Sequence, residues 1–227
     1  KKDRTEAGQN TDATLMKELA TVNRSLLRAL ARRASARTLM GEHNEAVDDY
    51  QEAVRLDPQN DDLKADLEAA VAAAAEAKTT GVANLKAEAD ANFGKGQYSK
   101  AKDCYKKALK LAGGAHLGCL SNRAACCLML GEDVECVKDC TAAMDQLPGG
   151  PLLSAEDGVE ELEEGEEAEA ERKKMERTRL RLHVRRGTAS ARLGDVAGAR
   201  SDYVVAKELS TDAAELAQLE RDLSKLL

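Results

Sequence analysis

The sequence predicts an all-α fold made of repeated helix–turn–helix units. Aromatic residues make up only 2% of the 227 residues and Trp is absent, whereas residues that favour helices, such as Ala, Leu, Glu, Lys and Arg, are abundant. Only three prolines occur, which leaves long stretches of chain without a helix breaker. A spacing pattern that starts at a glycine recurs four times along the chain and indicates the repeated unit.

Each copy of this pattern has a glycine, a small residue five positions later, and Tyr or Cys four positions after that. Another small residue follows three positions later, and an aliphatic residue comes after it. We expect each glycine to end one amphipathic helix and to allow a tight turn into the next, where the small residues let the two helices approach closely. The four copies are Gly41, Ala46, Tyr50, Ala53 and Leu56; Gly96, Ala101, Tyr105, Ala108 and Leu111; Gly131, Cys136, Cys140, Ala143 and Leu147; and Gly194, Ala199, Tyr203, Ala206 and Leu209.

The first part of the chain is expected to hold one repeat and a closing helix. Residues 1–11 are predicted to be a flexible tail, and residues 12–80 the last repeat and capping helix of a first array. The Ala-rich capping helix begins near Asp61 and places an apolar stripe on one face, made by Leu63, Leu67 and Val71. Since the chain starts with Lys1 and not Met, we expect it to be a piece of a longer protein.

The second part, residues 81–227, is expected to be a three-repeat domain with an acidic insertion at 149–171 and its own capping helix from Asp212. Pro58 and Pro148 are expected to stop the second helix of two repeats. A single continuous array of four repeats with two insertions is the alternative.

Charge is concentrated in the insertion. Glu156–Glu171 carries ten acidic and no basic residues, so the rest of the chain sums to −7 + 10 = +3, which argues against a nucleic-acid-binding protein with one dominant basic face. We expect a disordered, solubilising loop that becomes helical where the charges alternate, with Glu169 and Lys173 paired one turn apart. Alternatively, its glutamates enter a basic groove and compete with a ligand. No apolar run is long enough to span a membrane, and no signal peptide heads the chain.

The six cysteines fall within one short stretch and are interpreted as small core residues in a reducing cytosol. Metal binding by His116 with Cys119, or by Cys136 with Cys140, is the alternative; we predict no metal site and no cofactor. The scattered histidines and the absence of phosphate-binding or nucleophile motifs also predict that the chain is not an enzyme and has no catalytic residues.

The four copies resemble the tetratricopeptide repeat. The segments that carry the resemblance are "RRASARTLMGEHNEAVDDYQEAVRLDP", "LKAEADANFGKGQYSKAKDCYKKALKLAG", "CLSNRAACCLMLGEDVECVKDCTAAMDQLP" and "VRRGTASARLGDVAGARSDYVVAKELS". The resemblance implies superhelical arrays whose first helices line a concave groove for a peptide or a partner helix.

One branch of that family holds the acidic C-terminal tails of heat-shock chaperones in a clamp of Lys, Asn and Arg side chains, because a carboxylate needs several fixed donors. The resemblance carries this role to Lys86, Asn122, Arg181 and Arg185. Asp90 stands where the family has Asn, and its carboxylate would repel an incoming one unless it pairs with Lys86. Alternatively, Lys86 and the arginines are simply solvated surface charges.

An Arg-x-x-x-Arg-Arg run occurs twice, as Arg28, Arg32 and Arg33 and again as Arg181, Arg185 and Arg186, each time before a turn glycine. We expect both runs to lie on the first helix of a third repeat. Arg28 and Arg32 are therefore secondary groove candidates, whereas Arg186 is expected to face away from the groove.

The resemblance implies a cytoplasmic adaptor that binds a chaperone C-terminal peptide or another protein partner, with neither nucleic acid nor membrane as a ligand. The segment "HVRRGTA" is also similar to co-chaperones that assemble axonemal dyneins, which adds a ciliary role and location as a narrower hypothesis. The alternative is a structural subunit of a large assembly such as the axoneme, whose neighbouring chains fill the grooves.

Overall fold

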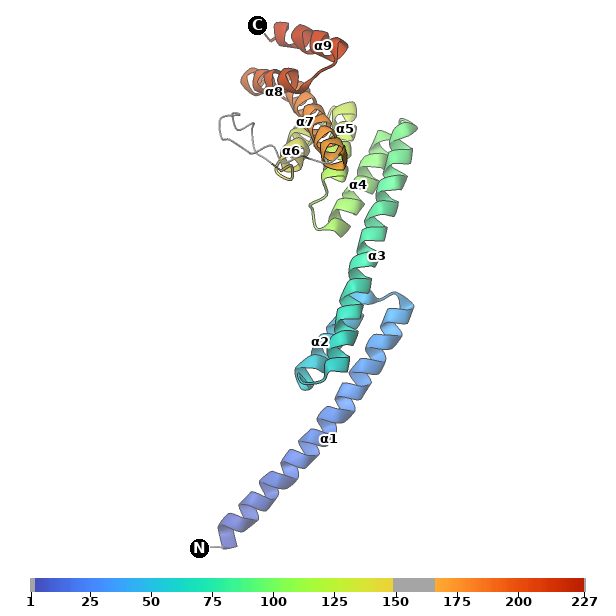
Figure 1. Cartoon of the computed structure of the whole chain (residues 1–227), viewed down its shortest axis with the longest axis vertical. Coiled ribbons are helices and arrows are strands. Elements are labelled where there is room, and N and C mark those ends of the chain that lie inside the picture. The colour runs from blue at the N-terminus through green and yellow to red at the C-terminus, as the bar shows by residue number, and fades with distance from the viewer. Residues whose placement is uncertain (1–2, 149–165, 227) are drawn as a thin grey trace. The chain divides into compact units, whose positions relative to one another are not determined.

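The computed structural model describes residues 3–148 and 166–226, and all the regular structure in these two ranges is α-helical (Figure 1). This confirms the predicted all-α fold. The chain divides into two compact units, Lys1–Thr80 and Gly81–Leu227.

The first unit is one helical hairpin closed by part of a third helix. Helices α1 (Asp3–Met40) and α2 (His43–Leu56) pack against each other, and α3 begins at Asp61. α1 already begins within the segment expected to be a flexible tail. The core consists of two small clusters to which all three helices contribute: Leu30, Ala53 and Leu63, and Ala34, Tyr50 and Ala70.

One residue of the predicted apolar stripe on α3 was assigned wrongly. Leu63 is buried and Leu67 packs against the core, but Val71 is 47% exposed. The neighbouring Ala70 is buried instead and packs in one cluster with Ala34 and Tyr50.

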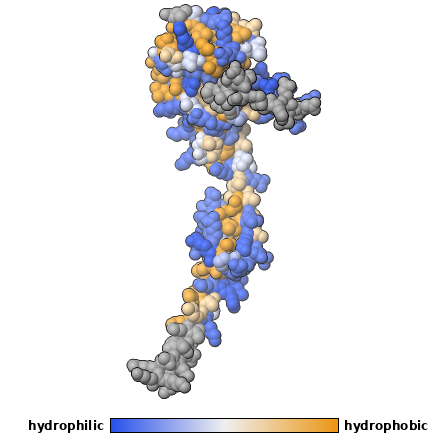
Figure 2. All heavy atoms as spheres, turned by 60° about the vertical axis from the view of Figure 1, so that its left-hand side comes forward, coloured by the Kyte–Doolittle hydropathy of each residue, from blue (hydrophilic) through white to orange (hydrophobic). Residues whose placement is uncertain are grey.

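α1 also carries exposed apolar side chains before it reaches this core. Leu15, Leu19, Val22 and Leu26 are all exposed, and their spacing of three and four residues places them on one face of the helix. The space-filling view shows apolar side chains at the surface of this unit, among charged ones (Figure 2).

Helix α3 (Asp61–Gly94) is continuous across the boundary between the two units. Its glycine at position 81 does not end the helix and serves packing instead. A Cβ atom added there would lie 2.8 Å from Cδ2 of Leu111 on α4, so a larger residue would require the Leu111 side chain to move.

The second unit contains the last part of α3 followed by α4 (Tyr98–Ala112), α5 (Leu117–Leu130), α6 (Asp133–Met144), α7 (Glu166–Arg192), α8 (Val196–Leu209) and α9 (Ala213–Ser224). From α4 to α9 each helix packs against the next, and α7 also contacts α5 (Figure 1). α9 closes the series and buries Leu219 against Tyr203 and Leu180.

The four turn glycines have the backbone conformation that the sequence pattern requires. Gly41, Gly96, Gly131 and Gly194 have φ between 73° and 82°, the left-handed region that favours glycine. In each turn the amide of the next residue donates to the carbonyl five positions earlier, at 2.9 Å. This bond satisfies a carbonyl that the helix end would otherwise leave without a partner.

Small residues make the close contacts within each hairpin. The position seven residues before the turn glycine is a fully buried alanine in three repeats, as Ala34, Ala89 and Ala124. In the fourth repeat it is Gly187, where an added Cβ would lie only 3.1 Å from Asp202 and Tyr203 of α8. An alanine at this position would therefore require Asp202 or Tyr203 to shift by a few tenths of an ångström.

The predicted acidic insertion lies mostly outside the described residues, which resume at Glu166. The predictions of a disordered loop and of a competing groove ligand concern that segment. From Glu166 the chain is helical, and the expected pair of Glu169 with Lys173 forms at 2.5 Å.

Candidate functional site

Three polar side chains, each from a different helix of the second unit, meet at Asp90 on α3. Lys86 lies one turn earlier on α3, and its Nζ donates to Asp90 Oδ2 at 2.5 Å. Asn122 on α5 donates its Nδ2 to Asp90 Oδ1 at 3.0 Å, and the hydroxyl of Tyr105 on α4 donates to the same oxygen. These four residues are called the Asp90 cluster below. Three of them were site candidates, whereas Tyr105 was identified only as part of the repeat pattern.

The Asp90 cluster stabilises an ionised carboxylate. Partial burial opposes ionisation of Asp90, but the hydrogen bonds from Lys86, Tyr105 and Asn122 outweigh that effect, so the pKa of Asp90 is lowered. Burial, together with the hydrogen bond to Asp90, raises the pKa of Tyr105 and keeps its phenol protonated. Asp90 is thus an anion paired with Lys86. This pairing is the condition under which we expected Asp90 to be compatible with a clamp.

The two arginines of α7 lie one turn apart and have only neutral partners. Arg185 is half-buried, and its Nη1 donates to the backbone oxygen of Ser121 at 2.5 Å and to the Ser121 hydroxyl at 3.0 Å. Arg181 is exposed and bonds within its own helix, to the backbone oxygen of Arg177 and the hydroxyl of Thr178. Neither forms an ion pair with any residue in the described part of the chain. We call Arg181 and Arg185 the arginine pair.

Burial and the neighbouring charge of Arg181 both disfavour the protonated form of the Arg185 guanidinium. Loss of water around its guanidinium lowers its pKa, and the positive charge of Arg181 lowers it further. An anion placed beside both side chains would relieve that repulsion. α5 connects this pair to the Asp90 cluster, because Ser121 and Asn122 are adjacent in the chain.

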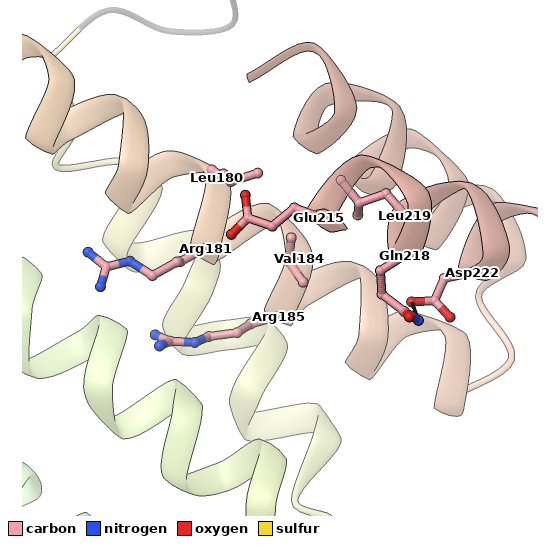
Figure 3. A pocket seen from close by; sticks show the side chains of 8 residues that line it. All are labelled: Leu180, Arg181, Val184, Arg185, Glu215, Gln218, Leu219 and Asp222. Carbon is pink, nitrogen blue, oxygen red and sulfur yellow. Dashed lines mark hydrogen bonds between the residues drawn. The ribbon is translucent and has the colours of Figure 1, made fainter. Parts of the chain in front are cut away.

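The arginine pair borders a pocket of about 210 Å³ between α7 and α9 (Figure 3). Leu180, Val184 and Leu219 give it an apolar lining. Both guanidinium groups point to the same side, away from the polar side chains that α9 contributes. The acids of α9 already have partners: Glu215 accepts from Ser210 at 2.9 Å, and Asp222 accepts from Lys225 at 2.8 Å.

In three repeats an arginine pairs with a buried aspartate, which the repeat pattern did not lead us to predict. In each, a first-helix arginine donates two hydrogen bonds to an aspartate sixteen residues later on the second helix, at 2.5–2.9 Å. The pairs are Arg33 with Asp49, Arg123 with Asp139 and Arg186 with Asp202. The constant spacing, with Asp directly before the Tyr or Cys of the pattern, could have revealed them. The remaining repeat has Glu88 and Cys104 at these positions.

The two arginine runs therefore contain residues with different roles. The last arginine of each run, Arg33 or Arg186, is held by a buried aspartate and connects the two helices of its hairpin. Arg28 and Arg32 are exposed on α1, and neither takes part in a hydrogen bond or ion pair among the described residues of the first unit. The other predicted site residues all belong to the second unit.

The six cysteines are all buried and free, as expected for core residues. His116, one of the alternative metal ligands, caps α5 by accepting the amide of Cys119 at 3.1 Å. Within residues 3–148 and 166–226, no three His, Cys, Asp or Glu side chains are grouped as a metal site would require. None of the described helices is long and apolar enough to cross a membrane.

Comparison with known family models identifies the repeated unit. Two segments, residues 27–60 and 87–114, match family models of the tetratricopeptide repeat. The chain contains tetratricopeptide repeats. These segments cover the hairpin of the first unit and the first hairpin of the second, and their turn glycines, Gly41 and Gly96, are those that the spacing pattern identified.

Among curated proteins, the chain is 40% identical over 91 residues to the mitochondrial import receptor subunit TOM34 of Rattus norvegicus and to that of Mus musculus. Each match covers 36% of this chain and only 29% of the relative. Among solved structures, the first TPR of Spaghetti (RPAP3), bound to the HSP90 peptide SRMEEVD, is 22% identical and has a TM-score of 0.47, covering 64% of this chain and 92% of that chain. The Arabidopsis OM64 TPR domain is 23% identical and has a TM-score of 0.48, covering 66% of this chain and 99% of that chain.

Proposed function

We propose that the second unit is a protein-interaction domain whose arginine pair holds an acidic segment of a partner protein. The observation that carries the proposal is that Arg181 and Arg185 lie together without a carboxylate from the described residues. Arg186, next in sequence, is bound to a buried aspartate by comparison. A half-buried guanidinium attracts an anion more strongly than a fully solvated one does, because the lower local dielectric strengthens the attraction.

The adjoining pocket indicates which acidic segment would bind best. An aliphatic side chain would fill the space between Leu180, Val184 and Leu219, while neighbouring carboxylates reach the two guanidiniums. The proposed ligand is therefore a peptide in which acidic residues flank an aliphatic one, such as the Glu-Glu-Val-Asp end of a heat-shock chaperone. On this proposal the chain acts as a co-chaperone-like adaptor.

Fluorescence anisotropy with the labelled peptide SRMEEVD tests the proposal. Arg181→Gln and Arg185→Gln should each weaken binding by about tenfold, the worth of one charged hydrogen bond. Arg200→Gln is the matched control, because Arg200 is an exposed arginine on α8 with no ion pair among the described residues. Binding should also weaken with added salt.

The proposal fails if a peptide with Gln and Asn in place of its acids binds equally well, or if Arg200→Gln weakens binding as much as the α7 variants do. Replacing the Val of the peptide by Ala tests the pocket separately. That change should weaken binding several-fold. An unchanged affinity would show that the pocket is not part of the ligand site.

A second candidate function is a structural subunit of a large assembly such as the axoneme, whose neighbouring chain fills the site. The closed Asp90 cluster favours it, since half of the predicted clamp is already occupied from within the chain. In that case no free peptide binds, and Arg185→Gln would reduce cosedimentation of the chain with the assembly.

The narrowest form of the adaptor proposal is a role in assembling ciliary dyneins, in the cytoplasm or at the cilium. It predicts that a dynein chain is recovered with the protein from ciliated cells. Recovery should fall for Arg181→Gln and not for Arg200→Gln.

A further inference from the structure

We infer that the carboxylate of Asp90 occupies the place that a ligand's terminal carboxylate would take. The site then binds acidic side chains of a peptide but does not recognise its C-terminus. This inference rests on the proposed function and concerns the same surface. It makes Asp90 the residue that determines which part of an acidic peptide is recognised.

The first support is that the donors of the Asp90 cluster are already in use. Lys86 donates to one carboxylate oxygen of Asp90, while Asn122 and Tyr105 donate to the other. A terminal carboxylate that entered here would have to break these bonds and lie beside a second negative charge. Two carboxylates sharing one set of donors repel each other.

The second support is that packing does not require a carboxylate at this position. The equivalent tyrosines of two other repeats also bond to the residue fifteen positions earlier, but that residue is a neutral hydroxyl. Tyr50 lies 3.0 Å from the Ser35 hydroxyl, and Tyr203 donates to Thr188 at 3.1 Å. Asp90 is thus a charged variant of a position that elsewhere only satisfies a tyrosine.

The third support is the uneven distribution of charge over the site. Lys86 and Asp90 neutralise each other on α3, whereas Arg181 and Arg185 on α7 lack any carboxylate partner in the described residues. Among the predicted clamp residues, cations without a carboxylate partner in the described part of the chain therefore lie only on α7. The lowered pKa of Asp90 keeps this asymmetry at neutral pH.

The experiment compares two N-terminally labelled peptides of sequence SRMEEVD, one with a free C-terminus and one amidated. The proteins are the wild-type chain, Asp90→Asn and Asp90→Ser. Asp90→Asn is nearly isosteric, and Asp90→Ser reproduces the hydroxyl found in other repeats, so Tyr105 keeps an acceptor in both. Asp103→Asn on α4 is the matched control, because Asp103 is exposed and outside the cluster. Circular dichroism checks the fold of each variant.

In the wild-type chain the free and amidated peptides should bind with the same affinity within about twofold. Both Asp90 variants should bind the free peptide about tenfold more tightly than wild type, and amidation should abolish that gain. Asp103→Asn should show neither effect.

The inference is overturned if amidation weakens binding to the wild-type chain by tenfold, or if neither Asp90 variant gains affinity for the free peptide. These outcomes are separate from failure of the proposed function, which is decided by the arginine variants. If wild type binds no peptide, a gain in the Asp90 variants that depends on the free C-terminus still supports the inference, and its absence refutes it.

Discussion

The pair of Arg186 with Asp202 offers a quantitative test of what holds a hairpin together. Asp202 is almost fully buried, with 4% of its side chain exposed, and accepts two bonds from Arg186 at 2.7 and 2.9 Å. His183 Nδ1 lies 2.8 Å from Oδ1 of the same carboxylate. Replacing Arg186 by Met keeps an unbranched apolar chain about as long as the stem that carries the guanidinium, but leaves a buried carboxylate without its cation.

Breaking a buried ion pair from one side costs about 3–5 kcal/mol, because the remaining charge stays desolvated. Here His183 keeps one contact with Asp202, and 27% of the Arg186 side chain is exposed, so we expect a loss of about 2–3 kcal/mol for Arg186→Met. Asp202→Asn should cost only about 1 kcal/mol, since the amide oxygen still accepts a bond and Arg186 can turn to water.

Urea unfolding of the full chain, followed by circular dichroism at pH 7, measures these losses. The double variant should be no less stable than Arg186→Met alone, because removing the carboxylate also removes the unpaired charge. Arg200→Met on the exposed face of α8 should change stability by less than about 0.5 kcal/mol. A loss below that value for Arg186→Met, or losses that simply add in the double variant, would refute this account of the pair.

Three further predictions concern the turns, the thiols and acid. Gly131→Ala should destabilise the protein by about 1 kcal/mol, because its cost is backbone strain alone; no atom lies within 4 Å of the added Cβ, and thermal unfolding measures the loss. Burial raises the pKa of Cys126 to about 11 and that of Cys127 to about 12, so a thiol reagent should label them only after unfolding; rapid labelling of the native chain would contradict this. Because Arg33 lowers the pKa of Asp49, and bonds from His183 and Arg186 lower that of Asp202 despite its burial, both carboxylates stabilise the fold at neutral pH. That stability should be lost as pH falls below about 4, and Asp202→Asn should flatten the pH dependence of the unfolding midpoint.

The sequence predicted the hairpins well because their determinants are local. A turn glycine such as Gly194 and a small residue such as Ala199 occupy fixed positions relative to each other, and helix geometry alone places them at the turn and the contact. The continuity of α3 could not be predicted in the same way. Gly81 suggests an interruption when considered in sequence, but its role is set by Leu111, thirty residues later.

The candidate site was only partly predictable, for the same reason. The pairing of Lys86 with Asp90 follows from their spacing of four on one helix, and the sequence allowed for it. The contribution of Tyr105 depends on how α4 packs against α3, which no local pattern states. The pocket behind the arginine pair requires α9 to lie against α7, so Leu219 could not be connected with Val184 beforehand.

The glycine at position 187 limits how far the repeats can be exchanged. The other three repeats have alanine at the position of Gly187. Placing the two arginines of α7 on a hairpin taken from one of those repeats would therefore replace this glycine by alanine. The added methyl would lie 3.1 Å from Asp202 and Tyr203, so these residues of α8 would have to shift by a few tenths of an ångström. Such a graft would carry both arginines of the pair and still disturb the contact with the helix that supports them. The recognition surface on α7 is therefore tied to its own partner helix and should be moved with it as one piece.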